Sequence, residues 1–138
     1  SLTHIGLTYV LGYKEELPPN IKSISLYCNN TFYIDYLPAT IEEIEFGGDF
    51  CLELSNIPSS IKKIKFDTRS EYNKELNCLP NGLEYLKLPF RYNHEIKNVP
   101  KGLEKIICSE ICQYMNNFIG IEVETYTFDP ISYDIYPK

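Results

Sequence analysis

A ten-residue phrase recurs along this chain at almost constant intervals, and that spacing limits the folds open to it. The phrase has the form apolar-Pro-x-x-apolar-x-x-apolar-x-apolar, and its five prolines are 20, 20, 22 and 20 residues apart. The copies are LPPNIKSISL, LPATIEEIEF, IPSSIKKIKF, LPNGLEYLKL and VPKGLEKIIC, which start at Leu17, Leu37, Ile57, Leu79 and Val99. Chance does not explain five matched positions in five copies, so the chain is a repeat protein.

The length of the repeat indicates what one unit contains. A unit of 20 to 22 residues is too short to hold a strand, two turns and a helix of ordinary length. The phrase ends in apolar-x-apolar, which is strand alternation, and its proline fixes the backbone where the unit begins. We therefore predict a mainly β, single-domain solenoid similar to leucine-rich repeats. Each coil should have one short parallel strand and return through turns, extended chain or a 3₁₀ turn.

The copies of the phrase divide the chain into a solenoid over 1–128 and a C-terminal cap or tail over 129–138. The solenoid comprises a partial first unit over 1–16, full units starting near 17, 37, 57, 79 and 99, and a degenerate unit over 119–128. In the degenerate unit Gly120 replaces the proline, and the phrase aligns Tyr126 with Ile106. The first unit is entered in its middle, so we expect a chain cut from a longer protein or a trimmed amino-terminal cap.

The return path has a pattern of its own. In three copies an aromatic residue lies seven positions before the residue that precedes the proline, at Phe50, Tyr72 and Tyr92. An aliphatic residue lies three positions before it, at Ile34, Leu54, Leu76 and Ile96. We expect both sets to point inward and to stack between coils. Asn73 and Asn93 follow two of the aromatics, and each either bonds turn backbone within its own coil or is a solvated loop residue.

Two successive copies of the phrase have opposite charge, because the glutamates of LPATIEEIEF become lysines in IPSSIKKIKF. In a stacked solenoid, residues one period apart lie on neighbouring strands, about 4.8 Å from each other. Glu42, Glu43 and Glu45 would then neighbour Lys62, Lys63 and Lys65. Opposite charges favour this register, although each exposed pair is worth only about 0–1 kcal/mol. We interpret the inversion as structural rather than functional.

The outward positions of the predicted strands are the candidate binding surface. The candidate partner-binding residues are Ser23, Ser25, Glu43, Glu45, Lys63, Lys65, Tyr85, Lys87, Lys105 and Ile107. They vary from coil to coil, as a surface that reads a partner would, or as solvent positions free to vary. Tyr85 and Ile107 favour binding, since an exposed aromatic or aliphatic side chain is a better anchor than a lysine. A second candidate is the turn over 89–92, although Tyr92 is expected to point into the core.

Other functions find little support in the residues. The net charge of −6 argues against nucleic-acid binding, and neither a stretch of about 18 apolar residues nor a secretory signal is visible. The five cysteines are odd in number, lack a CxxC pair and have no histidine pair beside them. Cys108 falls on a core position. We predict reduced thiols, no metal and no cofactor. We also predict no membrane or nucleic-acid partner and no enzymatic activity. The protein should be intracellular (host cytoplasm) or in a virion, and not secreted.

At LPATIEEIEF, GGDFCLELSNIPSSI and YNKELNCLP the chain resembles FNIP repeats. The Ile-Pro half of that motif is strong, whereas Phe50 is followed by Cys51, and Tyr72 and Tyr92 replace phenylalanine. The resemblance implies a protein-interaction module of the kind found in social amoebae and giant viruses. It also implies recruitment of substrates to a ubiquitin ligase of Skp1 and cullin, through an F-box in a region not in this chain. The alternative is a structural or assembly component of a virion or other particle.

Overall fold

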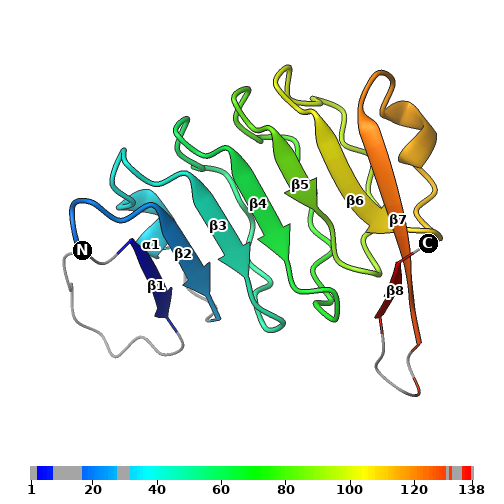
Figure 1. Cartoon of the computed structure of the whole chain (residues 1–138), viewed down its shortest axis with the longest axis horizontal. Helices are drawn as coiled ribbons and strands as arrows, with labels where there is room; N and C mark the ends of the chain where they lie inside the picture. Colours follow the sequence, from blue (N-terminus) through cyan, green and yellow to red (C-terminus); the bar gives the residue numbers. More distant parts are fainter. Residues whose placement is uncertain (1–2, 8–16, 28–31, 130, 132–134, 138) are drawn as a thin grey trace.

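The chain winds into a stack of coils with one strand on the same side of each coil (Figure 1). The computed structural model describes residues 3–7, 17–27, 32–129, 131 and 135–137. Within them the strands form one eight-stranded sheet in the order β1-β2-β3-β4-β5-β6-β7-β8. Strands that are neighbours in sequence are therefore neighbours in the sheet, as in a solenoid whose units touch only the adjacent units. The predicted mainly β, leucine-rich-repeat-like fold is confirmed.

Seven of these strands are parallel and one is antiparallel. The parallel strands are β1 (His4–Leu7), β2 (Ser23–Leu26), β3 (Glu43–Phe46), β4 (Lys63–Phe66), β5 (Tyr85–Lys87), β6 (Lys105–Ser109) and β7 (Glu122–Phe128). β8 (Ile135–Pro137) pairs antiparallel with the end of β7. Two short helices, α1 (Phe32–Asp35) and η1 (Met115–Asn117), lie on the return path. No helix in the described ranges is long and apolar enough to cross a membrane.

The proline of each phrase closes the turn that leads into a strand. The carbonyl of Pro38 accepts a hydrogen bond from the N–H of Ile41 at 3.0 Å, and the other four phrases repeat this bond between 3.0 and 3.3 Å. The N–H groups of Glu42 and Glu43 then both bond to the carbonyl of Lys22 in the coil before, at 2.8 and 3.1 Å. Because the same pair of bonds recurs at the start of β2–β6, these strands enter the sheet in the same register.

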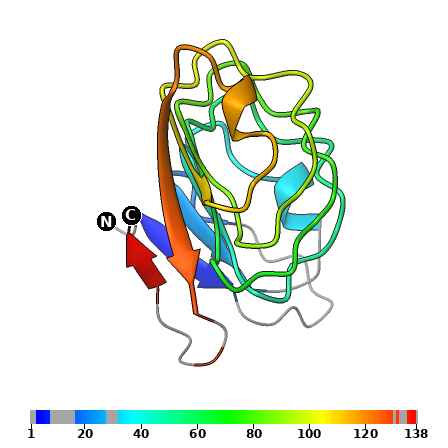
Figure 2. The same ribbon diagram turned by 90° about the vertical axis from the view of Figure 1, so that its right-hand side faces the viewer.

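The core lies between the sheet and the return segments, which Figure 2 shows on opposite sides of the stack. The middle inward residues of the strands, Ile24, Ile44, Ile64, Leu86 and Ile106, are fully buried. Deeper in the coil, Phe46 stacks on Phe66 with ring centroids 5.0 Å apart, and Phe50 stacks on Tyr72 at 5.9 Å. The aromatic and aliphatic return positions predicted to point inward are all buried. Repetition in the sequence thus becomes continuous columns of apolar contact.

The longest spacing between prolines is absorbed just after a single turn. Phe50 follows Phe46 by four positions, whereas Tyr72 follows Phe66 by six. The turn itself has the same length in both coils, because the N–H of Ser70 bonds to the carbonyl of Asp67 at 3.0 Å as the N–H of Phe50 bonds to that of Gly47 at 3.2 Å. The aromatic residue of the longer coil therefore comes two residues after the turn closes. The N–H of Tyr72 also donates to the Ser70 hydroxyl at 3.1 Å. The aromatic ring therefore keeps its place in the column despite the insertion.

Two expectations from the sequence need correction. The side-chain oxygen of Asn73 accepts the N–H of Asn93 at 3.0 Å, so this asparagine bonds between coils and not within its own coil. In the last coil Val123, not Tyr126, lies beside Ile106, and Tyr126 lies beside Ser109. The turn before β7 contains Gly120, with φ of 76°, in place of the proline, so the phrase no longer fixes its spacing. Tyr126 is nevertheless buried, at 4% exposed, and its hydroxyl donates to the carbonyl of Leu88 at 2.8 Å.

A pair of adjacent glycines provides a test of how closely the coils approach. A Cβ added to Gly47 would lie 2.5 Å from the ring and 3.1 Å from the Cα of Tyr27, whereas one added to Gly48 would meet nothing within 4 Å. We expect Gly47→Ala to lower the free energy of unfolding by about 1–3 kcal/mol through overpacking. Gly48→Ala should stay within about 0.5 kcal/mol of the parent. Urea unfolding of the two variants measures the difference, and equal midpoints would contradict the close contact.

Candidate binding face

The ten candidate residues lie together on the outward side of β2–β6, which we call the strand face. One column consists of Ser23, Glu43, Lys63, Tyr85 and Lys105, and the next of Ser25, Glu45, Lys65, Lys87 and Ile107. All are partly exposed except Ser25, which is only 3% exposed. Nine of the ten candidates are thus accessible to a partner in this structure, and Ser25 is not.

His4 is a member of this face that sequence reasoning missed. It lies on β1 beside Ser23, and its two ring nitrogens are 2.8 Å from the Ser23 hydroxyl and 3.3 Å from the Ser25 hydroxyl. The imidazole therefore uses both serines as hydrogen-bond partners. Its position one period before Ser23 was the available signal, but the degenerate first unit obscured it.

The charged columns adopt the predicted register, but their closest ion pair is diagonal. Glu43 lies opposite Lys63 and Glu45 opposite Lys65. The shortest distance, 2.8 Å, joins the Nζ of Lys65 to Glu43, while Lys63 is 3.8 Å from the same carboxylate. That hydrogen bond raises the pKa of Lys65, against the lowering effect of partial burial. Among the described residues no ion pair includes Glu45, so Glu43 binds both lysines of the next strand.

A third column, just before the strands, alternates in sign from Lys22 to Glu84. Lys22 bonds to Glu42 at 2.9 Å, and Lys62 lies 3.9 Å from Glu84. The hydrogen bond and charge of Lys22 hold the pKa of Glu42 below its usual value, and Lys62 adds a smaller attraction. Glu42 therefore bonds to the preceding coil and not to Lys62 as predicted from the sequence. These groups are exposed, and their main effect is on register rather than on stability.

Apolar side chains interrupt the charges near β5 and β6. The Nζ of Lys63 lies 5.3 Å from the centroid of the Tyr85 ring, which is within the range of a cation–π contact. Burial raises the pKa of Tyr85, so its hydroxyl stays protonated near neutral pH. Ile107 is partly exposed on the next strand beside Lys87. The strand face therefore offers an aromatic and an aliphatic surface within a charged surround.

The turn over 89–92, the second candidate, contributes less to a binding surface. Tyr92 is 2% exposed and lies in the core, as expected. Its N–H closes the turn on the carbonyl of Pro89 at 3.1 Å. Phe90 is partly exposed, with its ring centroid 6.3 Å from that of Tyr126, and Arg91 is exposed. Arg91 is thus the accessible polar group of this turn.

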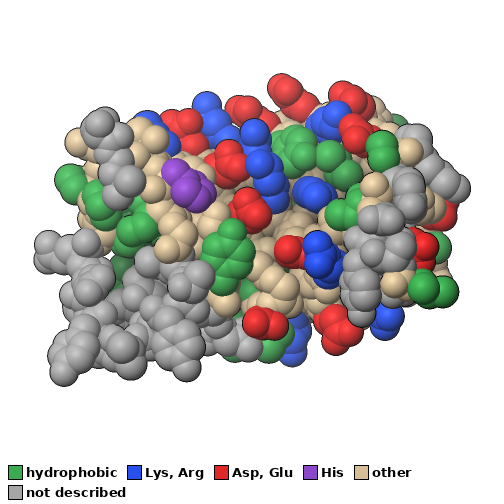
Figure 3. Space-filling view, turned by 60° about the horizontal axis from the view of Figure 1, so that its bottom comes forward, with side chains coloured by type: hydrophobic (Ala, Val, Ile, Leu, Met, Phe, Trp, Pro, Cys, Tyr) green, Lys and Arg blue, Asp and Glu red, His purple; other side chains and the backbone are tan. Residues whose placement is uncertain are grey.

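On the side of the molecule that Figure 3 shows, the described residues do not form a large patch of charge of one sign. Lys and Arg side chains lie between Asp and Glu side chains near the carboxyl ends of the strands, and hydrophobic side chains occur in small groups. A uniform polyanion such as nucleic acid would be repelled by the interspersed carboxylates. The mixture suits a protein partner with its own alternating charges.

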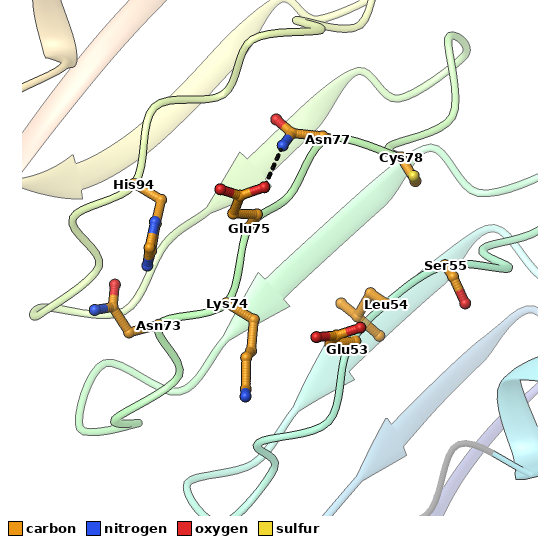
Figure 4. A pocket seen from close by; sticks show the side chains of 9 residues that line it. All are labelled: Glu53, Leu54, Ser55, Asn73, Lys74, Glu75, Asn77, Cys78 and His94. Atoms are coloured by element: carbon orange, nitrogen blue, oxygen red, sulfur yellow. Dashed lines mark hydrogen bonds between the residues drawn. The ribbon is translucent and has the colours of Figure 1, made fainter.

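On the return side the coils leave a hollow of about 360 Å³ between the segments 53–55 and 73–78 and His94. Its polar lining includes Glu53, Lys74 and Glu75, and Asn77 donates to Glu75 at 2.9 Å. His94 and Cys78 lie at opposite ends of the hollow (Figure 4), so they do not form a nucleophile–base pair there. The hollow therefore lacks the arrangement that acyl transfer requires.

The cysteines follow the pattern of the repeat. Cys108 and Cys112 are buried free thiols at core positions, and Cys78 is an exposed free thiol. Within the described ranges no group of three His, Cys, Asp or Glu side chains is placed to hold a metal ion. Cys28 lies outside the described residues. The prediction that Cys108 belongs to the core is confirmed.

Comparison with known proteins also indicates a repeat protein similar to leucine-rich repeats. The FNIP Repeat family model matches residues 13–49 and 51–91, more than half of the chain, so the chain belongs to the FNIP-repeat family. Among solved structures it is similar to the giant-virus protein CroV588, described as a novel circular LRR protein structure. The TM-score is 0.57 at 26% sequence identity, over 67% of this chain and 15% of that chain. No curated protein matches the chain. Leucine-rich-repeat-like modules of this type generally serve protein interaction.

The ion pairs of the strand face predict a difference between two neighbouring glutamates. Glu43→Lys places a cation beside Lys63 and Lys65 and removes both short contacts. We expect it to lower the free energy of unfolding by up to about 1 kcal/mol. Glu45→Lys, with no ion pair to lose among the described residues, should have the smaller effect. Thermal unfolding at low salt and in 1 M NaCl tests this, since screening should reduce the gap. An equal effect of both changes would contradict the diagonal pairing.

Proposed function

We propose that this solenoid binds a protein partner on its strand face. The observation that carries the proposal is the partial exposure of Tyr85 and Ile107 among charged side chains on β5 and β6, toward one end of an otherwise polar surface. The inward columns are restricted to apolar residues by packing, whereas the outward columns hold serine, glutamate, lysine, tyrosine and isoleucine. A rigid sheet with different side chains in each coil can distinguish one partner surface from another.

The chemistry of the face indicates the chemistry of the partner. β3 presents glutamates and β4 lysines, so a complementary surface carries a basic stripe beside an acidic one. An apolar side chain of the partner would meet the ring of Tyr85, and Ile107 would extend this contact. Tyrosine is a frequent hot spot because it buries a large area with little loss of conformational entropy.

Site-specific photo-crosslinking tests where the partner binds. A photoreactive benzoylphenylalanine in place of Tyr85 should capture the partner, whereas the same group in place of exposed Lys74 on the return side should not. With the captured partner purified, Tyr85→Ala should raise Kd at least about tenfold, which corresponds to about 1.4 kcal/mol. Lys74→Ala should leave Kd unchanged. Capture from position 74, or equal Kd values for both variants, would place the partner elsewhere.

The narrower form of the proposal is that the module recruits substrates for an F-box ubiquitin ligase. Membership of the FNIP family supports it, because the resemblance implies an F-box on the same polypeptide in related viral proteins. Skp1 should then co-purify with the native full-length protein and remain bound to the Tyr85→Ala variant, whereas the substrate should be lost. A native protein that never retains Skp1 would leave only the general proposal.

The alternative is an assembly role, which the two end strands of the sheet favour. β1 and β7 each have one neighbour in the parallel stack, and exposed strand edges can add another chain. Sedimentation velocity across a hundredfold range of concentration separates the two proposals. A single monomeric species supports a binding module, and a concentration-dependent series of larger species supports assembly.

A further inference from the structure

Part of the last parallel strand has an open edge. β8 pairs with Tyr126, Thr127 and Phe128 of β7. In the part of the chain that the structure describes, residues Glu122–Thr125 have β6 on one side and no strand on the other. Figure 2 looks onto this end of the stack, where β7 lies in front and β8 lies beside only its lower part. We call Glu122–Thr125 the open edge.

The backbone of the open edge is oriented to add a strand. The N–H of Glu122 donates to the carbonyl of Glu104 at 2.9 Å, and the carbonyl of Tyr126 accepts the N–H of Glu110 at 3.1 Å. Both groups therefore point back toward the preceding coil. Because backbone groups alternate along a strand, the N–H and C=O groups of Val123 and Thr125 point to the open side. Such a row of groups is a template for an incoming strand.

The side chains of the open edge repeat a pattern found inside the sheet. The open edge reads Glu-Val-Glu-Thr, and β3 reads Glu-Ile-Glu-Phe. Val123 continues the inward column but is 36% exposed, whereas Ile44 at the same place in β3 is fully buried. The difference follows from what covers each strand, since β4 lies beside β3 on the side where the open edge has no strand.

The charge of the open edge is only half neutralised. The Nζ of Lys105 lies 3.1 Å from Glu122 and 2.7 Å from Glu124, so two carboxylates share one ammonium group. The side chains of Glu122 and Glu124 are still 67% and 42% exposed. A cation arriving from the open side would meet one uncompensated negative charge next to an incompletely covered valine.

The protein contains a template for what stacks on such a strand. β4, which reads Lys-Ile-Lys-Phe, pairs in parallel with β3. Its two lysines lie 3.8 and 2.8 Å from Glu43, and its Ile64 lies beside Ile44 with both side chains fully buried. A strand in which basic residues alternate with an aliphatic one therefore forms ion pairs with an acidic strand of this type and covers its inward side chain.

We propose that the open edge of β7 binds an extended segment of a partner protein in which lysine or arginine alternates with an aliphatic residue. The segment adds as a parallel strand, with its basic side chains beside Glu122 and Glu124 and its aliphatic side chain on Val123. Pairing of two copies through their open edges is disfavoured, because the antiparallel arrangement brings four glutamates together. This site is distinct from the strand face, which lies on the surface of the sheet and not at its edge.

Two peptides taken from the chain itself provide a matched test. The probe has the sequence of residues 57–68, IPSSIKKIKFDT, and the control has that of residues 37–48, LPATIEEIEFGG. They share the phrase and differ in the sign of its charges. Titration of the ¹⁵N-labelled protein should give saturable shifts of the Val123 and Thr125 amides with the probe and none with the control. Shifts centred on β1 or on the strand face, or equal shifts with both peptides, would overturn the proposal.

Charge reversal of the site supplies the second arm. The double variant Glu122→Lys with Glu124→Lys should lose the probe and gain the control peptide, whereas Glu53→Lys on the return side should change neither. The charge reversal also removes both ion-pair partners of Lys105. Glu122→Gln is therefore made in parallel, and it should weaken probe binding several-fold without adding a like charge. Thermal midpoints confirm that each variant is folded. Retained binding of the probe by the folded double variant would overturn the site, while Tyr85→Ala should leave peptide binding intact.

Discussion

The parallel register between successive coils is the constraint on which the rest of the structure depends. A shift of one residue would move the isoleucine column from the core to solvent, so packing fixes the inward positions strictly. At the start of each strand from β2 to β6 a carbonyl of the preceding coil accepts two N–H groups, which repeats this register from coil to coil. Successive isoleucines alone would allow any coil to stack on any other. Charge alternation and the close approach of Gly47 to Tyr27 make each coil fit its own neighbour better than another coil.

The same constraint explains why the side chains that could select a partner lie on one surface. Packing dictates the inward side chains, and the turns need proline and small residues, so the outward side chains are the ones free to carry chemistry. The strand face uses that freedom for charges of both signs around Tyr85 and Ile107. The open edge of β7 differs in kind, since its recognition would come from backbone groups, with the side chains selecting the partner by charge.

Much of the fold could be predicted from the sequence, because a strict period turns sequence spacing into spatial contact. The core columns, the outward candidates and the pairing of Glu43 with Lys63 all follow from counting residues. The diagonal contact of Lys65 with Glu43 could not be predicted, because a long lysine side chain can reach either carboxylate from the same backbone position. The last coil departed from expectation where the proline was lost, and with it the feature that sets the spacing. His4 was missed because the degenerate first unit obscured its place one period before Ser23. The hollow beside Glu75 depends on three-dimensional proximity that the repeat does not encode.

The two-residue insertion that follows the Asp67–Ser70 turn has a consequence for how such a molecule can vary. The extra length is taken up just after the corner where the chain leaves the sheet, and neither the strand before it nor the aromatic column after it shifts register. This corner is therefore a place where a lineage or a designer can lengthen one coil while the neighbouring coils continue to stack. Turns of different length and sequence at such corners would form a rim beside the sheet. This rim could vary while the stacked strands that support it stay unchanged.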